Sequence, residues 1–564
     1  MFYAKDGLAG FTVGDQFDGN VVETLDEITL SATWINGSTF VSEDGFVDLD
    51  ATAGDIVAGS ATSKTSYVDA LAVGNIDGLT VDAATDVILN AANILNGSAT
   101  AQTGSATLGA GAYISNQDVN AATTVGLTAG NDVVGSSVLA GSDVTVGAVS
   151  AHTTDIVSGG SVLATLSQEL DGSTINALGP VDVSANNVTN SAVDADGVID
   201  VDTVSDITNS VFKGDAAGLA VDLAAGGNVR NADVTATAGA ALVDATLEID
   251  GTDVQALEDI TALAGTGISA SSFTSDTGAI LAQTLTGNVV GGILNAKAGA
   301  VVLEALDGEI DATDVTALLD IAALAADAIG ASGFTTEQGD LLITAVTGDI
   351  VGSSFYAKEG LADILVGDQF DGNVVETFEE IDVVASWING STFVSETGYV
   401  DLEATVGDIV AGSATSKTSY VDALAAGNID GLTVDAATDV ILAATNILNG
   451  SATAQTGSAT LDADEFIGNQ DIDAATTVSL DAVLDVVGTS VLAGSDVTVG
   501  DDDVVRSLHT SDIVSGGMVD INLSEEMDGS TVNALGMVEV AANNVTNSAV
   551  DADGVIDVDT VSDI

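Results

Sequence analysis

The chain has 564 residues, of which 85 are acidic and 8 are basic, so its formal net charge is −77. This charge leaves no basic patch for phosphate groups, which excludes nucleic acid and anionic membrane surfaces as expected partners. Hydrophobic residues make up 46% of the chain, a fraction that excludes a disordered acidic polypeptide.

The same charge predicts where the protein works. Repulsion among so many carboxylates needs screening by salt or divalent cations, which favours an extracellular or cell-surface location. The chain has no cysteine, and no apolar run approaches the roughly 20 residues that a transmembrane helix needs. We therefore expect divalent cations as partners, and neither nucleic acid nor a transmembrane segment.

A long repeat begins at the first residues. The segment FYAKDGLAG at Phe2 recurs as FYAKEGLAD at Phe355, an offset of 353 residues. After the acidic insert GDDDVVR (500–506) the offset becomes 357, because His152 then matches His509. We predict a first unit at 1–354 with about 18 coils and a second, incomplete copy at 355–564, in one continuous rod.

A shorter period runs inside both copies. An apolar anchor is followed five positions later by a second apolar residue, and most anchors are 18 to 21 residues apart. Three steps are irregular: Val133 to Ile156, Ile156 to Leu170, and Val486 to Ile513. The other anchors include Phe17, Ile35, Ile56, Ile76, Ile94, Ile114, Val188, Ile207, Val229, Ile249, Ile268, Ile310, Ile329, Ile350, Phe370, Ile388, Ile409, Ile429, Ile447, Ile467, Met527 and Val545.

The residues between anchors predict an all-β fold. Polar and apolar residues alternate at 198–204 and 299–306, which is typical of strands with one face turned inward. Leucine-rich repeats are excluded because their Leu and Asn consensus is absent. We predict a parallel β-helix (β-solenoid) of about 28 stacked coils with about 20 residues each, roughly 130 Å long at about 4.8 Å per coil. Phenylalanines at the fifth position should fill one side of its core: Phe40, Phe212, Phe273, Phe334, Phe355 and Phe393.

This rhythm carries a resemblance. The stretch VTNSAVDADGVIDVDTVSD at 188–206 resembles the β-helical shafts of filamentous-haemagglutinin-like secreted bacterial adhesins. The resemblance rests on period and alternation along nearly the whole chain, and the family's N-terminal secretion domain is not recognisable. It implies an extracellular fibre or stalk.

The column just before the anchors is rich in Asn, Asp and Glu. The favoured interpretation is a turn-forming ladder, in which Asn side chains bond to one another along the axis. The alternative is that carboxylates of successive coils bind a cofactor, namely Ca²⁺ or another cation. That alternative places metal ligands at Asp132, Asp155, Asp485 and Asp512, the latter two near the inserted Asp501, Asp502 and Asp503.

Catalysis is not expected. The basic residues are spread along the chain, and His152 and His509 stand 357 residues apart, so no His-based triad or zinc site is predicted within one unit. Trp34 and Trp387 are expected to be buried or half-buried plugs at a coil corner.

We expect a non-enzymatic structural rod that self-associates end to end or laterally into a filament, sheath or surface layer. The alternative is the shaft of a large secreted adhesin whose binding tip lies outside these residues. The open coil at each end leads us to expect a segment of a longer chain or of an end-to-end fibre.

Overall fold

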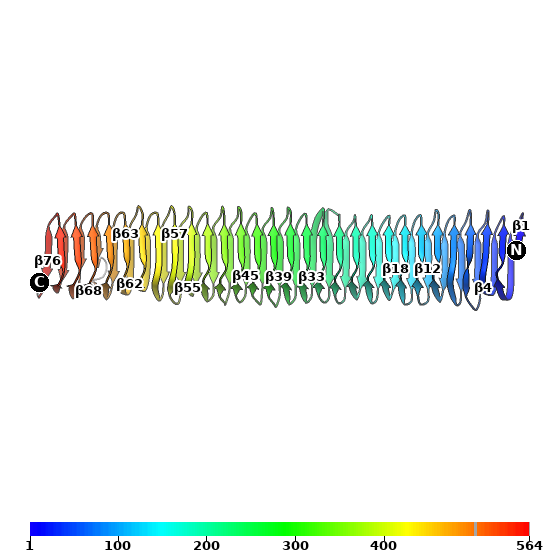
Figure 1. Cartoon of the computed structure of the whole chain (residues 1–564), viewed down its shortest axis with the longest axis horizontal. Coiled ribbons are helices and arrows are strands. Elements are labelled where there is room, and N and C mark those ends of the chain that lie inside the picture. The colour runs from blue at the N-terminus through cyan, green and yellow to red at the C-terminus, as the bar shows by residue number, and fades with distance from the viewer. Residues whose placement is uncertain (501–504, 563–564) are drawn as a thin grey trace. The chain divides into compact units, whose positions relative to one another are not determined.

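The computed structural model describes residues 1–500 and 505–562. It divides into two compact units, Met1–Gly278 and Ala279–Ile564, each of which is a stack of parallel β-coils (Figure 1). The prediction of an all-β parallel solenoid is confirmed, since the described residues form about 29 turns of about 19 residues and contain no helix. The sequence repeat restarts at Phe355, whereas the division between packing units falls at Gly278.

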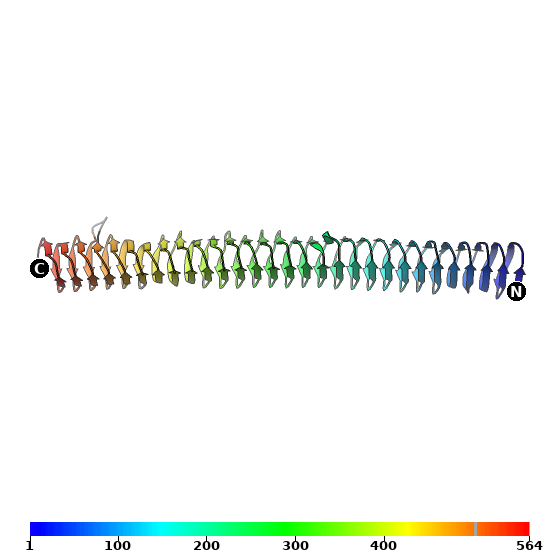
Figure 2. The same cartoon turned by 90° about the horizontal axis from the view of Figure 1, so that it is seen from above.

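A coil of unit 1 consists of three short strands joined by tight corners. Each strand pairs in parallel with the strand at the same place in the next coil, and the coils follow one another at regular intervals (Figure 2). Two consecutive coils show this arrangement: β22 (Glu169–Asp171), β23 (Thr174–Ala177) and β24 (Val181–Ala185), followed by β25 (Asn187–Thr189), β26 (Ala192–Ala195) and β27 (Ile199–Thr203).

Unit 2 repeats this design. A typical coil contains β52 (Gln369–Asp371), β53 (Val374–Thr377) and β54 (Ile381–Ala385). The first and second strands fuse in some coils, as in β55 (Trp387–Ser395), which pairs with both β52 and β53 of the preceding coil. Residues that bond between coils are therefore about 20 positions apart in sequence, which is the period read from the sequence.

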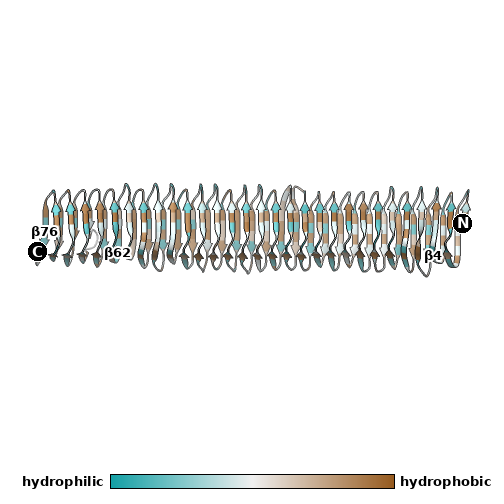
Figure 3. Cartoon of the chain, in the orientation of Figure 1, coloured by the Kyte–Doolittle hydropathy of each residue, from teal (hydrophilic) through white to brown (hydrophobic). Residues whose placement is uncertain are grey.

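The core of each unit is a column of small and branched side chains. Successive residues of a strand point to opposite faces, and Figure 3 shows the resulting mixture of apolar and polar positions along the strands. The six fifth-position phenylalanines are buried, which confirms their core-filling role. In unit 2 the rings of Phe334 and Phe355 stack with centroids 5.4 Å apart, so this column also fixes the spacing of neighbouring coils.

Two of the predicted anchors are wrong. Val133 pairs with Ala151 and Ala151 with Leu170, so Ala151 is the anchor and Ile156 occupies the fifth position beside Val138. In unit 2, Leu508 rather than Ile513 pairs with Val486. Alanine is too small to stand out in an apolar pattern, and the insert at 500–506 displaced the second anchor. The corrected register removes the irregular steps around Ile156 that the sequence pattern contained.

Candidate functional site: polar ladders between coils

The corner after the first strand dictates a special bonding pattern. The residue two positions after the anchor has a positive φ, for example Gly172 (φ 58°) and Asn190 (φ 50°). Glycine adopts this conformation without steric cost, and Asn tolerates it better than most other residues. The kink takes the next N–H group out of reach of the neighbouring backbone, so it needs another acceptor.

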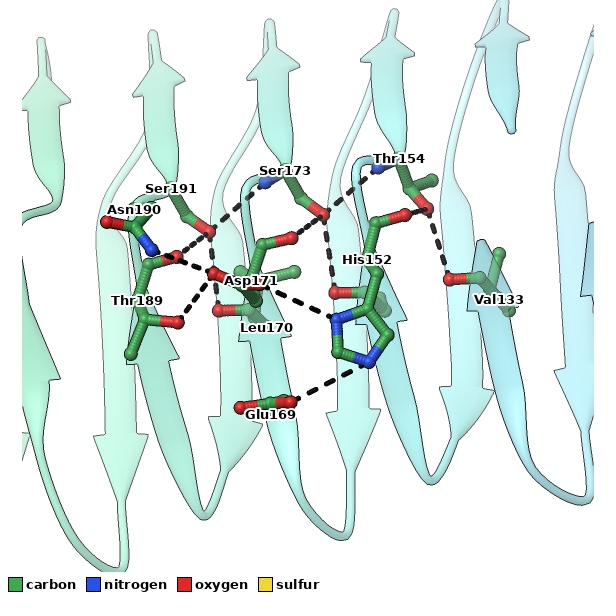
Figure 4. A network of polar contacts seen from close by, with 11 residues as sticks. Val133, His152, Thr154, Glu169, Leu170, Asp171, Ser173, Thr189, Asn190 and Ser191 are labelled. Carbon is green, nitrogen blue, oxygen red and sulfur yellow. Dashed lines mark hydrogen bonds and ion pairs between the residues drawn. The ribbon is translucent and has the colours of Figure 1, made fainter. Parts of the chain in front are cut away.

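A ladder of buried hydroxyl groups supplies that acceptor. Ser173, which follows Gly172, accepts a hydrogen bond at Oγ from the backbone N–H of Thr154 in the preceding coil, 3.1 Å away (Figure 4). Its own N–H donates to Oγ of Ser191 in the following coil at 3.3 Å. The single proton of the Ser173 hydroxyl lies between two acceptors, the carbonyls of Asp171 (3.2 Å) and Ala151 (3.4 Å). The N–H groups of Thr154 and Ser173 and the Ser173 hydroxyl therefore all have partners, as burial requires.

The same ladder continues in unit 2. The N–H of Ser332 donates to Oγ of Ser353 at 3.2 Å, and the N–H of Ser353 donates to Oδ1 of Asn373 at 2.8 Å. Asn373 does not interrupt the ladder, because its own N–H donates to Oγ of Ser391 at 3.1 Å. Sequence reasoning missed this column. The recurrence of Ser or Thr three positions after many of the anchors was the signal that could have identified it.

The predicted ladder before the anchors is confirmed. In unit 2, Asn446 donates its amide to Oδ1 of Asn428 at 2.7 Å, and Asn428 donates to Oδ1 of Asp408 at 3.1 Å. In unit 1, Asn228 bonds to Oδ1 of Asp206 at 2.9 Å. A second amide ladder occupies the kink itself, where Asn231 donates to Asn209 at 3.1 Å. The carboxylates in these columns thus act as acceptors for the next coil.

His152 lies in a small charged cluster on this surface. Its Nε2 is 3.7 Å from Oε1 of Glu169, and its Nδ1 is 3.8 Å from Oδ2 of Asp171, both in the next coil (Figure 4). Hydrogen bonds from Asn190 and Thr189, and then the nearby His152, lower the pKa of Asp171. In unit 2, His509 pairs in register with Asp528, whose pKa is lowered in the same way by Thr546 and Asn547.

This cluster resembles a catalytic triad only in composition. The nearby Ser173 is buried, and its hydroxyl is fully used by backbone groups rather than bonded to His152. A nucleophile needs an adjacent base within hydrogen-bonding distance. The arrangement therefore functions as an inter-coil contact.

The structure separates the four predicted metal ligands into two columns. Asp132 pairs with Ser150, whereas Asp155 pairs with Ser137 and receives a hydrogen bond from Thr174 at 2.5 Å. The prediction that Asp132 and Asp155 share one column is therefore wrong, because it depended on the misplaced anchor at Ile156.

Their counterparts in unit 2 follow the same pattern. Asp485 is almost fully buried and is held by the guanidinium of Arg506, with Nε 2.9 Å from Oδ1, whereas Asp512 accepts from Thr531. Asp501, Asp502 and Asp503 lie outside the described residues. Within the described part of the chain, no group of three or more acidic, His or Cys side chains could hold a metal ion.

Carboxylates instead gather on the outer face of the third strand. Four of them stand in register in unit 2, on β51 (Ala362–Val366), β54, β56 (Val400–Ala404) and β58 (Val421–Ala425): Asp363, Asp382, Asp401 and Asp422. Neighbouring strands are about 4.8 Å apart, so like charges face each other directly. Partial burial, and then the neighbouring carboxylates, raise the pKa of Asp382 and Asp401, while burial raises that of Asp422.

Unit 1 carries a related row on β24, β27 and β30 (Gly218–Ala225). Asp182, Asp200 and Asp222 are in register, and burial followed by nearby carboxylates raises the pKa of Asp200 and Asp222. Such rows can take up protons or associate loosely with cations. Either event would reduce repulsion between adjacent coils.

The scarce basic side chains serve the same stacking. Six basic side chains form ion pairs with carboxylates 18 to 21 positions away, and therefore in neighbouring coils: Lys64 with Glu43, Lys213 with Asp194, Arg230 with Glu248, Lys358 with Glu337, Lys417 with Glu396, and Arg506 with Asp485. Lys64 and Lys417 thus bind carboxylates of their own unit. Most of these pairs are half exposed and contribute little stability individually.

Comparisons with protein-family models, curated proteins and solved structures find no match for this chain. The described residues include no helix long and apolar enough to cross a bilayer. The stacked coils are consistent with a β-helical shaft, which is the part of the predicted resemblance that the structure supports.

Proposed function

We propose that this protein is a non-enzymatic, extracellular structural element whose function is to form a stiff, acidic β-solenoid that self-associates into a filament, sheath or surface layer. One observation carries the proposal: in both units the side chains suited to chemistry are used to join one coil to the next. Hydroxyl, amide and carboxylate groups bond along the stacking direction in both units.

Self-association is supported by the way in which coils join. Strands of successive coils pair in parallel, so the surface of one coil is complementary to another coil of the same design. Ile199 in unit 1 is fully buried where β30 of the following coil covers its strand, whereas Ile556, at the same place in the identical sequence of unit 2, is 46% exposed. A second copy that docks coil on coil would cover Ile556 on β76 (Ile556–Thr560), so this residue is the probe of the proposed association.

The acidic rows give the proposed rod a tunable surface. They keep separate rods apart by repulsion at low ionic strength, and cations that screen them allow lateral contact. The alternative function is the shaft of a secreted adhesin, in which the solenoid presents a binding tip that lies outside these residues. An extracellular rod of this composition suits either role.

The test is the sedimentation of the full chain as a function of protein and Ca²⁺ concentration. The proposal expects assemblies that grow with protein concentration and that Ile556→Asp abolishes. Leu163→Asp is the matched control, because Leu163 is also exposed but lies on the outer face of β21 (Val162–Leu166). Assembly that is unaffected by Ile556→Asp would refute coil-on-coil association. A monomer at every concentration would favour the adhesin shaft.

A further inference from the structure

A shallow surface hollow surrounds one tryptophan in unit 2. It has a volume of about 330 Å³ and is lined by Gln369, Trp387, Ile388, Asn389, Asp408 and Val410. Trp387 lies in register with Gln369 of the preceding coil, and its side chain is 40% exposed. The hollow thus combines an exposed aromatic surface with amide and carboxylate groups.

The indole ring is fixed flat on the solenoid. A methyl group on Gly407 of the next coil would overlap the shared bond of the two indole rings, so the absence of a side chain there lets the ring lie directly over the backbone. One face of the ring is therefore covered by the protein. Trp387 remains 40% exposed, so the ring forms a platform that is open to solvent.

Asp408, which also lines the hollow, uses one of its two carboxylate oxygens in hydrogen bonds. Oδ1 of Asp408 accepts hydrogen bonds from the backbone N–H of Asn428 at 2.6 Å and from its side-chain amide at 3.1 Å. Oδ2 accepts none from the described residues, so one carboxylate oxygen is available at the rim. The only charge among the lining residues is thus negative.

Unit 1 contains the same arrangement. Trp34 pairs in register with Gln16, is 39% exposed and lies over Gly54, while Oδ1 of Asp55 accepts from the N–H of Asn75 at 2.6 Å. Asn36 and Val57 match Asn389 and Val410. Other positions differ between the two copies; for example, Thr29 in unit 1 corresponds to Asp382 in unit 2. The residues of the hollow are therefore shared although the surrounding sequence is not fully identical.

We propose that each tryptophan hollow binds an alkylammonium cation, either a small molecule or the side chain of a lysine on a basic partner. A cation is attracted to the face of an aromatic ring, and among the aromatic side chains Trp attracts it most strongly. The adjacent carboxylate adds an opposite charge, and the net charge of −77 concentrates cations at the surface. An anion has no basic group to bind in this hollow.

The chain offers a direct readout, because Trp34 and Trp387 are its only two tryptophans. The full chain carrying Trp34→Phe reports only the hollow of unit 2 through its fluorescence. Choline is titrated at constant ionic strength against two controls, NaCl and the uncharged isostere 3,3-dimethylbutan-1-ol. The proposal expects a saturable fluorescence change with choline alone.

Two variants in this background test the role of the carboxylate. Asp408→Asn keeps an oxygen that can accept from Asn428 but removes the charge, and should weaken choline binding roughly threefold to fivefold. Glu359→Gln makes the same change in net charge at an exposed position outside the hollow and outside the acidic row, and should leave binding unchanged. Hydrogen exchange of the Asn428 backbone amide is measured in Asp408→Asn. Protection of this amide shows that the coil corner remains folded in the variant.

A second ligand distinguishes the sources of the cation. Tetralysine that binds at least tenfold more tightly than choline at the same ionic strength supports a lysine of a basic partner, and equal binding supports a small alkylammonium ion. The proposal is overturned if the isostere or NaCl gives the same response as choline, or if Asp408→Asn and Glu359→Gln behave alike. This inference is independent of self-association, because binding at the hollow needs only a single chain.

Discussion

The buried hydroxyl ladder makes a prediction that can be measured at a single amide. Substituting Ser173 by Ala removes the oxygen that accepts the N–H of Thr154 and the donor that reaches the carbonyls of Asp171 and Ala151. The side chain is buried, so water cannot replace the lost acceptor. The change therefore leaves a buried polar group without a partner.

The expected cost follows from that geometry. A buried donor left unsatisfied costs about 1–3 kcal/mol, which is more than the net value of the hydrogen bond itself. At about 1.4 kcal/mol for each factor of ten, the exchange rate of the Thr154 amide should rise roughly 5-fold to 150-fold. Coils contact mainly their neighbours, so the effect should fade within one or two coils.

Native-state hydrogen exchange measures this directly. Ser173→Thr should retain most of the protection, because Thr154, Thr252 and Thr313 already serve in the same column. Thr165→Ala is the matched control, since Thr165 is exposed on the coil that contains Thr154. If Ser173→Ala leaves the Thr154 amide as protected as in the control, the hydroxyl is not its acceptor and the ladder does not join these coils.

Three further predictions concern charge and packing. Burial and carboxylate neighbours raise the pKa of Asp401, so the folded state binds protons more readily than the unfolded state, and stability falls as the pH rises through the folded pKa. Asp401→Asn should therefore stabilise unit 2 at pH 7 by about 0.2–1 kcal/mol per removed like-charge contact in denaturant unfolding, and an equal or lower stability would contradict this. Asn190→Gly keeps the left-handed corner but removes a hydrogen bond that lowers the pKa of Asp171, so carbon NMR titration should show that pKa rising; an unchanged value would mean that the amide does not hold the carboxylate. Gly407→Ala should displace the indole of Trp387, destabilise the coil by about 1–3 kcal/mol and shift its fluorescence to longer wavelength, and a spectrum like that of the native chain would show that the ring does not lie over Gly407.

The sequence predicted the coil period well because that period is set by the apolar residues that every coil must bury. Phe334 and Phe355, spaced by one coil, were correctly placed in one column of the core. The register failed at Ala151, where the anchor is a small residue and the larger Ile156 lies five positions later. That one shift also moved Asp155 into the wrong column.

The polar bonding was only partly predictable. Asn428 and Asn446 recur at the coil period, and the amide ladder between them could be inferred from their spacing alone. The hydroxyl ladder depends on the positive φ at residues such as Gly172, which creates an N–H group without a backbone acceptor. A sequence pattern does not show that vacancy, although Ser or Thr recurs three positions after many of the anchors. The hollow at Trp387 likewise depends on contacts between three coils, which become visible only once the register is known.

Electron microscopy of the purified full chain, with and without millimolar Ca²⁺, tests the central claim most directly. The account predicts filaments one solenoid wide whose length increases with protein concentration, and bundles of these filaments when Ca²⁺ screens the acidic rows. Separate short particles under both conditions would contradict a self-assembling structural role and would point to the shaft of an adhesin. Rounded particles without a repeating axial spacing would contradict the stacked-coil architecture itself.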